Sequence, residues 1–218
     1  MTIDETVTSE RVCDETTRRA VVEVLRATYH REKRWVAEPS EQIPPSDLDR
    51  SDISWFLAKV CGRPAGVVRV LYDPPLAEYA TYGLKLLDTA PDVEEFIKTN
   101  RVAEIGRFAV VREHRRNFII AAELMRAATE ETVARGFTHF VTDVFEDDPH
   151  SPLGFHTRVM GFYAVATHDA GELQAKNRRI TLVLDLKDCY RRLSARRSWF
   201  FRYMTGQWAD ALHRRLAA

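Results

Sequence analysis

The sequence predicts an α/β fold with a mixed sheet, and three observations lead to this prediction. From residue 102 onward, β-branched runs alternate with amphipathic helical runs, which is the pattern of an α/β layout. Apolar residues make up 45% of the chain and charged residues 29%, as in ordinary globular proteins. The 218 residues are enough to bury a substantial core, and we expect one main domain over residues 1–186.

The first part of the chain predicts a helix and a hairpin. Residues 16–36 carry apolar side chains near helical spacing, which indicates one amphipathic helix with a break near His30. Prolines then enforce a loop. Ile53–Val60 and Ala65–Tyr72 are β-branched runs joined by a Gly-Arg-Pro turn, and they predict a hairpin.

A long connection follows the hairpin. Residues 73–100 contain three prolines and one short helical stretch, Val93–Lys98. Connections of this length in a compact domain are usually functional or disordered, so we take this one as a candidate substrate loop.

The remaining elements alternate in type. They are read from strand runs and from glycines at the expected helix ends. In order, they are a strand (Val102–Val111), a helix (Asn117–Arg135), a strand (Phe137–Phe145), a short helix (Leu153–Met160) and two strands (Phe162–Thr167 and Arg179–Leu186).

Residues 187–218 differ in composition from the rest of the chain. They hold eight basic side chains against two acidic ones, and large apolar residues recur every fourth position from Phe200 to Leu212. We expect a basic, aromatic, amphipathic helix packed on or beside the main domain. Two other interpretations are docking of an acidic carrier protein and contact with an anionic membrane.

Charge and cysteine content exclude several classes of protein. The 32 basic and 32 acidic residues cancel, so we expect no nucleic-acid partner. Three cysteines lie far apart without a histidine at ligand spacing, so we expect neither a disulfide framework nor a metal site. The acidic start of the chain does not match a signal peptide and no apolar run reaches membrane-spanning length, so we expect a cytoplasmic protein.

One strand carries an unusual charged pair, Glu104 and Arg107 within Val102–Val110. Residues three apart point to opposite faces of a regular strand unless a bulge reorients one of them. From the residues alone, a structural salt bridge and a catalytic pair are both open interpretations.

Five motifs follow one another along the chain. They are Arg26-Ala27-Thr28-Tyr29 with Glu32-Lys33-Arg34-Trp35, then Asp47-Leu48-Asp49, Gly66-Val67-Val68-Arg69, Glu104-x-x-Arg107-Phe108-Ala109-Val110, and Phe155-His156-Thr157-Arg158-Val159-Met160-Gly161-Phe162. Together with the order of elements over residues 15–186, they resemble the GNAT acyltransferases. Within that superfamily, the chain resembles the branch of autoinducer synthases and N-acyl amino acid synthases. The strongest match is Glu-x-x-Arg-Phe-x-Val, and His156 stands where this branch usually has tyrosine.

The resemblance implies an N-acyltransferase that moves an acyl group, in this branch a fatty acyl group, from acyl-CoA or acyl-carrier protein to a small amino-acid-like amine. It implies Glu104, Arg107 and His156 as catalytic residues, with a bulge in the strand. Glu104 would take the amine proton through water, and His156 would protonate the departing thiolate. A lone histidine on a short helix is also commonly a packing residue.

The same resemblance implies where the two substrates bind. The helix start after Val111 would hold the donor's phosphate through backbone N–H groups, with Arg115 at the basic position. Bulky Arg116, Phe118 and Ile120 replace the usual glycines and suit a phosphopantetheine arm better than a pyrophosphate. The donor-binding candidates are Phe108, Ala109, Val110, Arg112, Arg115, Arg116, Asn117 and Phe118. The acceptor-binding candidates are Arg26, Trp35, Asp47, Asp49, Arg69 and Phe145.

Three alternatives remain open. The chain could be a short-chain acetyltransferase that uses acetyl-CoA, or a non-catalytic module that keeps the fold and binds a ligand. A third alternative is an acyl-homoserine-lactone synthase that uses S-adenosylmethionine.

Overall fold

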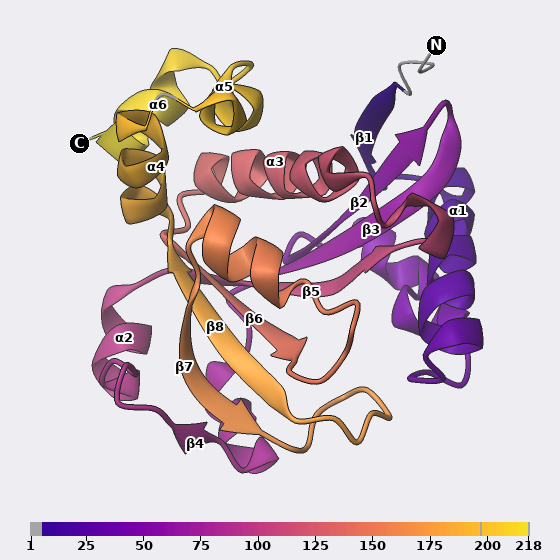
Figure 1. The fold of residues 1–218 in the computed structure, drawn as a ribbon, viewed down its shortest axis with the longest axis horizontal. Helices are drawn as coiled ribbons and strands as arrows, with labels where there is room; N and C mark the ends of the chain where they lie inside the picture. Colours follow the sequence, from indigo (N-terminus) through magenta and orange to yellow (C-terminus); the bar gives the residue numbers. More distant parts are fainter. Residues whose placement is uncertain (1–5, 197, 218) are drawn as a thin grey trace. The chain divides into compact units, whose positions relative to one another are not determined.

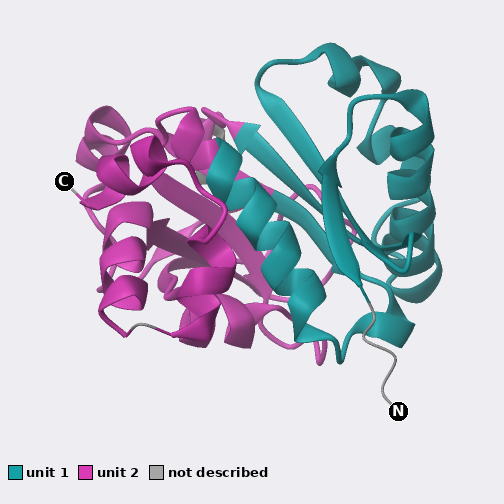
Figure 2. Cartoon of the chain, turned by 90° about the horizontal axis from the view of Figure 1, so that it is seen from above, with its two compact units in different colours: residues 1–71, 106–131 teal, residues 72–105, 132–218 magenta. Residues whose placement is uncertain are grey.

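The computed structural model describes residues 6–196 and 198–217. The chain forms two compact units, each built from two stretches of sequence (Figure 2). Unit 1 contains the chain up to Leu71 together with Gly106–Glu131, and unit 2 contains Tyr72–Ile105 together with the chain from Thr132 onward. The chain passes from one unit to the other within a single strand, β5 (Val102–Val110).

Unit 1 combines antiparallel strands with helices. Strands β1 and β3 pair with β2 in antiparallel fashion, and the strand order is β1-β2-β3-β5. The elements are β1 (Val7–Arg11), α1 (Glu15–Leu25), the π-helical turn η1 (Arg26–Glu32), the 3-10 turns η2 (Pro39–Gln42), η3 (Pro45–Asp49) and η5 (Arg112–His114), β2 (Ile53–Val60), β3 (Arg63–Tyr72) and α3 (Phe118–Ala134).

The expected hairpin and the first helix are confirmed. The helix changes from α-helical to π-helical at Arg26, four residues before the expected break at His30. Asp14 starts it as the cap: its carboxylate accepts the backbone N–H of Thr17 at 2.8 Å. Strand β1 was not expected from the sequence.

Unit 2 has a mixed sheet with the strand order β5-β6-β8-β7-β4. Strand β5 pairs with β6 in parallel from Val102 to Ile105, and the other neighbours are antiparallel. The elements are η4 (Leu76–Tyr82), β4 (Lys85–Leu86), α2 (Val93–Thr99), β6 (His139–Phe145), η6 (Phe155–Met160), β7 (Tyr163–His168) and β8 (Arg179–Asp185), followed by three C-terminal helices (Figure 1). The short helix expected inside residues 73–100 is confirmed as α2.

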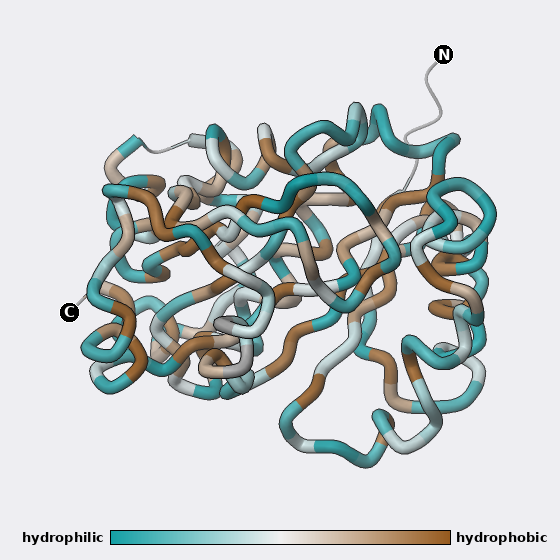
Figure 3. The backbone as a smooth tube through the Cα atoms, turned by 90° about the horizontal axis from the view of Figure 1, so that it is seen from below, coloured by the Kyte–Doolittle hydropathy of each residue, from teal (hydrophilic) through white to brown (hydrophobic). Residues whose placement is uncertain are grey.

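Each unit has its own core. In unit 2, an apolar cluster lies on one face of the sheet and consists of Val102, Val141, Val165, Ala166 and Val183. In unit 1, Ile120 and Leu124 of α3 are fully buried and pack close to Gly66 of β3. Hydrophobic and hydrophilic stretches are interspersed along the backbone (Figure 3). No helix among the described residues is long and apolar enough to cross a membrane.

The C-terminal segment is helical, but it forms three short helices where one was expected: α4 (Leu186–Ala195), α5 (Trp199–Thr205) and α6 (Asp210–Ala217). Ser198 starts α5 as a cap, because its hydroxyl accepts the backbone N–H of Phe201 at 3.1 Å. Tyr190 of α4 holds the group together: its hydroxyl lies 2.9 Å from Nδ1 of His213, and its ring contacts Phe201 and Trp208. The predicted division into residues 1–186 and 187–218 stays a prediction.

Candidate active site

Strand β5 is irregular at the predicted charged pair. Arg107 has a φ of 52°, in the left-handed region that an arginine rarely adopts. Gly106, Arg107 and Phe108 are all half-buried, so the alternation of buried and exposed residues is lost there. This is the backbone signature of a bulge, and it relaxes the rule that residues three apart must face opposite sides.

Glu104 lies in the half of β5 that belongs to unit 2. Its side chain is half-buried, and Oε2 accepts a hydrogen bond from the hydroxyl of Tyr79. Tyr79 belongs to η4, inside the connection that was expected to serve as a substrate loop.

Arg107 and its neighbour are contacted by the N-terminal segments of unit 1. Nε of Arg107 donates to Oε1 of Gln42 in η2 at 2.8 Å. The hydroxyl of Tyr29 in η1 donates to the carbonyl oxygen of Phe108 at 3.4 Å. The second half of β5 is therefore held by side chains from residues 26–42.

The basic turn after β5 already contains an ion pair. Nη1 and Nη2 of Arg115 donate to the two carboxylate oxygens of Glu32 at 2.6 and 2.5 Å, and Nε donates to the carbonyl oxygen of Val110 at 3.1 Å. The two side chains are 17% and 24% exposed. A donor phosphate that binds Arg115 must therefore compete with Glu32.

The other residues of the turn differ in exposure. Arg112 and Arg116 are exposed, while Asn117 and Phe118 are half-buried. The side-chain oxygen Oδ1 of Asn117 accepts a hydrogen bond from the backbone N–H of Ile119 at 3.1 Å. Ile120, one of the bulky residues at the places of the usual glycines, is fully buried and lies close to Gly66.

The acidic pair expected to bind the acceptor is only partly accessible. Asp47 is buried and accepts a hydrogen bond from the indole N–H of Trp55 at 3.1 Å, and Arg50 lies 3.7 Å from its other oxygen. Asp49 is exposed. Arg69 lies opposite Trp55 in the β2–β3 register. These contacts give Asp47 a structural role in holding Trp55.

Arg26 is the first residue of the π-helical turn η1, and Trp35 follows the turn. Arg26 is exposed. Trp35 is half-buried and packs edge-on against Tyr29, with ring centroids 5.2 Å apart. The ammonium of Lys33 lies 5.5 Å from the Trp35 ring. Trp35 is thus an anchor of this turn.

His156 is completely buried in η6. Its ring lies 4.9 Å from that of Phe162, and burial lowers its pKa to about 4. The imidazole is therefore neutral near pH 7. Burial disfavours the imidazolium that a proton donor to the leaving thiolate would need, and the catalytic role of His156 stays a prediction.

Phe145 ends β6 and is covered by Arg179, whose guanidinium lies 5.1 Å from the ring centroid. Burial lowers the pKa of Arg179. Arg179 also donates to the carbonyl oxygens of Asp169 and Leu173 at 3.0 and 2.8 Å. Phe145 thus belongs to a packed cation–π contact.

Sequence reasoning did not assign a role to Tyr79, Gln42 or Glu32. Glu32 was part of a recognised motif, and Tyr79 lies in the flagged long connection. The length of the connection 73–100 was the feature of the sequence that pointed to this region, but no residue pattern distinguished Tyr79 within it.

Comparison with known proteins identifies the family. The model of the acetyltransferase (GNAT) family matches residues 17–162, which is more than half of the chain. This chain belongs to the GNAT family. It is accordingly an N-acyltransferase, and its mixed α/β architecture is the GNAT fold.

Solved structures support this fold. FeeM, an N-acyl amino acid synthase from uncultured soil microbes, aligns with a TM-score of 0.66 and 13% identity, covering 89% of this chain and 99% of FeeM. Aminoglycoside 6'-acetyltransferase type Ii aligns at 0.56 and 13% identity, covering 83% and 97%. The ribosomal-protein-S18-alanine N-acetyltransferase of Escherichia coli aligns at 0.56 and 12% identity, covering 83% and 94%. No curated protein sequence matches the chain.

Proposed function

We propose that this GNAT enzyme moves a fatty acyl group from a thioester to the amine of a small amino-acid-like acceptor and so forms an amide. The observation that carries the proposal is the carboxylate of Glu104, held by Tyr79 on a strand whose bulge at Arg107 fits the Glu-x-x-Arg-Phe-x-Val motif. The alignment with FeeM over nearly its whole length supports the choice of this branch, since FeeM is an N-acyl amino acid synthase.

In the proposed reaction, the acceptor amine attacks the thioester carbonyl. A C–N bond forms, the C–S bond breaks with its electron pair staying on sulfur, so the donor leaves as a thiolate, and Glu104 takes the proton that the amine loses, through a water molecule. Direct attack is favoured over a covalent enzyme intermediate. Burial raises the pKa of the Cys189 thiol to about 11, and Cys13 and Cys61 are exposed in ordinary surface positions.

The donor's phosphate is proposed to bind at the turn of Arg112, Arg115 and Arg116. Since Glu32 neutralises Arg115 in the free enzyme, the turn offers less positive charge than three arginines suggest. A phosphopantetheine arm with one phosphate suits this turn better than the pyrophosphate of coenzyme A, so we propose acyl-carrier protein as the preferred donor and acyl-CoA as a weaker one.

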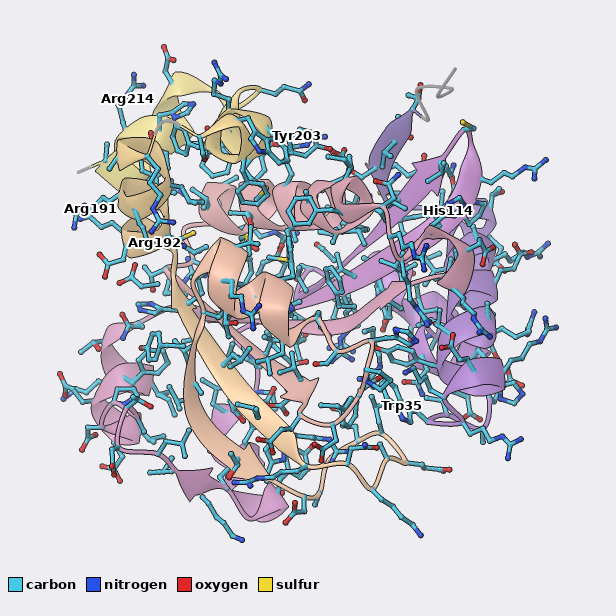
Figure 4. All side chains as sticks on the ribbon, viewed as in Figure 1. Trp35, His114, Arg191, Arg192, Tyr203 and Arg214 are labelled. Carbon is cyan, nitrogen blue, oxygen red and sulfur yellow. The ribbon has the colours of Figure 1, made fainter. Side chains whose placement is uncertain are left out.

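An acyl-carrier protein is acidic, and we propose that it docks on the C-terminal helices. Arg191 on α4 and Arg214 on α6 are exposed (Figure 4). Trp199 is 53% exposed at the start of α5. Charge complementarity of this kind mainly speeds association and depends on salt. Contact with an anionic membrane stays a prediction for the same helices.

Product analysis tests the function directly. The purified enzyme is incubated with a mixture of amino acids and with acetyl, octanoyl and palmitoyl donors, each carried by coenzyme A and by acyl-carrier protein, and amides are detected by mass spectrometry. We expect N-acyl products from the octanoyl or palmitoyl donors, with higher kcat/KM for the carrier protein. Efficient transfer of acetyl groups alone would show a short-chain acetyltransferase instead.

Variants of Glu104 test the proposed base. Glu104→Gln keeps the size of the side chain but cannot take the proton, and we expect kcat to fall about 100-fold or more. Glu94→Gln, at an exposed position of α2, is the matched control and should keep full activity. Equal activity of the two variants would contradict the role of Glu104.

A further inference from the structure

The contact between Glu104 and Tyr79 joins a strand to a long connection. Glu104 belongs to β5, and Tyr79 lies 25 residues earlier, in η4. A phenol hydroxyl that donates to one carboxylate oxygen restricts the rotation of the carboxylate. Tyr79 is therefore able to set the direction in which Glu104 presents its lone pairs.

Glu104 lies on the face of the sheet that carries the apolar cluster of unit 2. Side chains alternate along a strand, so residues two apart share a face. In the register, Glu104 lies beside Val141, and Asp143 lies beside Thr181. On this face Glu104 thus lies in one row with Val141 and Val183, and the next row contains Asp143 and Thr181.

The segment that carries Tyr79 is packed on this face. Leu76 and Leu84, on either side of Tyr79, both pack against the apolar cluster. The segment between them is therefore fastened at two points, and its position relative to Glu104 is set by apolar contacts as well as by the hydrogen bond.

A second aromatic residue of the same segment, Tyr82, contacts the polar end of this face. The Tyr82 ring is nearly parallel to that of His168, at 13° with centroids 5.9 Å apart, and it lies 5.8 Å from the Tyr79 ring. Tyr82 thus connects Tyr79 to His168.

His168 is a rigid support for this stack. Its ring is buried, with Nδ1 2.7 Å from the carbonyl oxygen of Ala170 and Nε2 3.1 Å from Oδ2 of Asp143. The other oxygen of Asp143 accepts the hydroxyl of Thr181 at 2.8 Å. Both ring nitrogens face acceptor oxygens, and a protonated ring can donate to both because it carries an N–H on each nitrogen. Burial lowers the pKa of His168, but the hydrogen bond and charge of Asp143 outweigh it and raise the pKa overall.

We propose that Tyr79 is a positioning residue for Glu104, and that the stack of Tyr82 on His168 holds η4 where Tyr79 reaches the carboxylate. The inference rests on the proposed function, in which Glu104 takes the amine proton. Tyr79 keeps its own proton throughout and acts only by orienting the carboxylate. The contacts from Asp143 of β6 and His168 of β7 through Tyr82 and Tyr79 then orient the carboxylate of Glu104.

Tyr79→Phe removes the hydroxyl and keeps the ring. A hydrogen bond to a charged group is worth about 1.5–3 kcal/mol, so we expect kcat to fall about 10- to 100-fold. The KM of the donor should stay within about twofold, because only the orientation of Glu104 changes. Tyr163→Phe, which alters a 40% exposed tyrosine of β7, is the matched control and should keep kcat.

Tyr82 separates positioning from general loss of structure. Tyr82→Phe keeps the stack on His168 and should retain kcat within about twofold, whereas Tyr82→Ala should lower it about tenfold. Because Tyr82 acts only through Tyr79, the double variant Tyr79→Phe/Tyr82→Ala should be no slower than Tyr79→Phe alone. Circular dichroism and thermal unfolding of each variant report whether the fold is kept.

The outcomes distinguish this inference from the function on which it rests. If the wild-type enzyme forms amides and Glu104→Gln does not, while Tyr79→Phe keeps its kcat or changes only the donor KM, the positioning role is refuted and the function stands. Additive losses in the double variant would also refute it. If the wild-type enzyme forms no amide with any donor, the proposed function fails and the role of Tyr79 fails with it.

Discussion

Stability of this enzyme should depend on pH through His156. The histidine is fully buried, and its pKa is lowered from 6.5 to about 4 because burial disfavours the charged ring. In the unfolded chain the ring is solvated and takes up a proton below about pH 6.5. Between pH 6.5 and pH 4, the unfolded state therefore binds more protons than the folded state, and stability falls as the pH falls.

The size of this loss follows from the two pKa values. When the ring is fully protonated in the unfolded chain and still neutral in the folded protein, the two pKa values correspond to a loss of about 3 kcal/mol in the free energy of unfolding. At pH 5 about 2 kcal/mol of this is already lost, and at pH 7.5 almost none. An effect of 2 kcal/mol is a large part of the stability of an ordinary domain.

Urea unfolding at pH 7.5 and pH 5 measures the effect when the wild-type protein is compared with His156→Leu. Leucine is close to histidine in volume and does not titrate. Between pH 7.5 and pH 5, the unfolding free energy of the wild-type protein should therefore fall by about 2 kcal/mol more than that of His156→Leu. Other titrating groups are common to both proteins and cancel. His150→Leu, at an exposed position, is the control.

A difference that stays constant within about 0.5 kcal/mol between the two pH values would contradict this account, since it would mean that His156 accepts a proton in the folded protein as readily as in the unfolded chain. Such a result would support His156 as a donor of a proton to the leaving thiolate. An imidazole NMR signal that titrates above pH 6 would lead to the same conclusion.

Two further predictions concern unit 1. An added Cβ at Gly66 would lie 3.0 Å from the carbonyl oxygen of Ala109 and 3.1 Å from Cγ2 of Ile120. Gly66→Ala should therefore lower the free energy of unfolding, measured in urea, by about 1–3 kcal/mol. Gly154→Ala is the control and should not lower it, because the space around Gly154 is open. Glu32→Gln removes the charge that competes for Arg115, so the KM of the phosphate-bearing donor should fall about threefold to tenfold in steady-state kinetics, as for loss of about 1 kcal/mol of ion pairing. A higher KM would show instead that Glu32 holds Arg115 ready for the donor.

Local sequence patterns were sufficient for most of the fold. The β2–β3 hairpin, α2 and α3 lie within a few residues of their expected bounds, because β-branched runs, turn residues and helix-ending glycines act over short distances. Strand β1 escaped notice because Val7–Arg11 has a single strongly apolar residue. Its place depends on distant partners: Ser9 and Arg11 contact Glu123 and Glu131 of α3.

The candidate site divides in the same way. Its motifs are local in the sequence, so the carboxylate of Glu104 and the basic turn after β5 were recognisable from the residues, while the irregularity of β5 was implied only by the family resemblance. Their partners were not: Tyr79 reaches Glu104, and Glu32 reaches Arg115 from 83 residues away. Which side chain meets a given carboxylate or guanidinium depends on how the intervening chain is folded.

Residue patterns along the chain were enough to identify an α/β protein with the GNAT order of elements and a charged pair on one strand. Which of its ionisable groups are charged, and which are held by a partner, depends on the folded chain. His156 is neutral because it is buried. Arg115 is paired because Glu32 lies within hydrogen-bond distance. Desolvation and ion pairing depend on atoms brought together from distant parts of the chain, and no local pattern of residues encodes them.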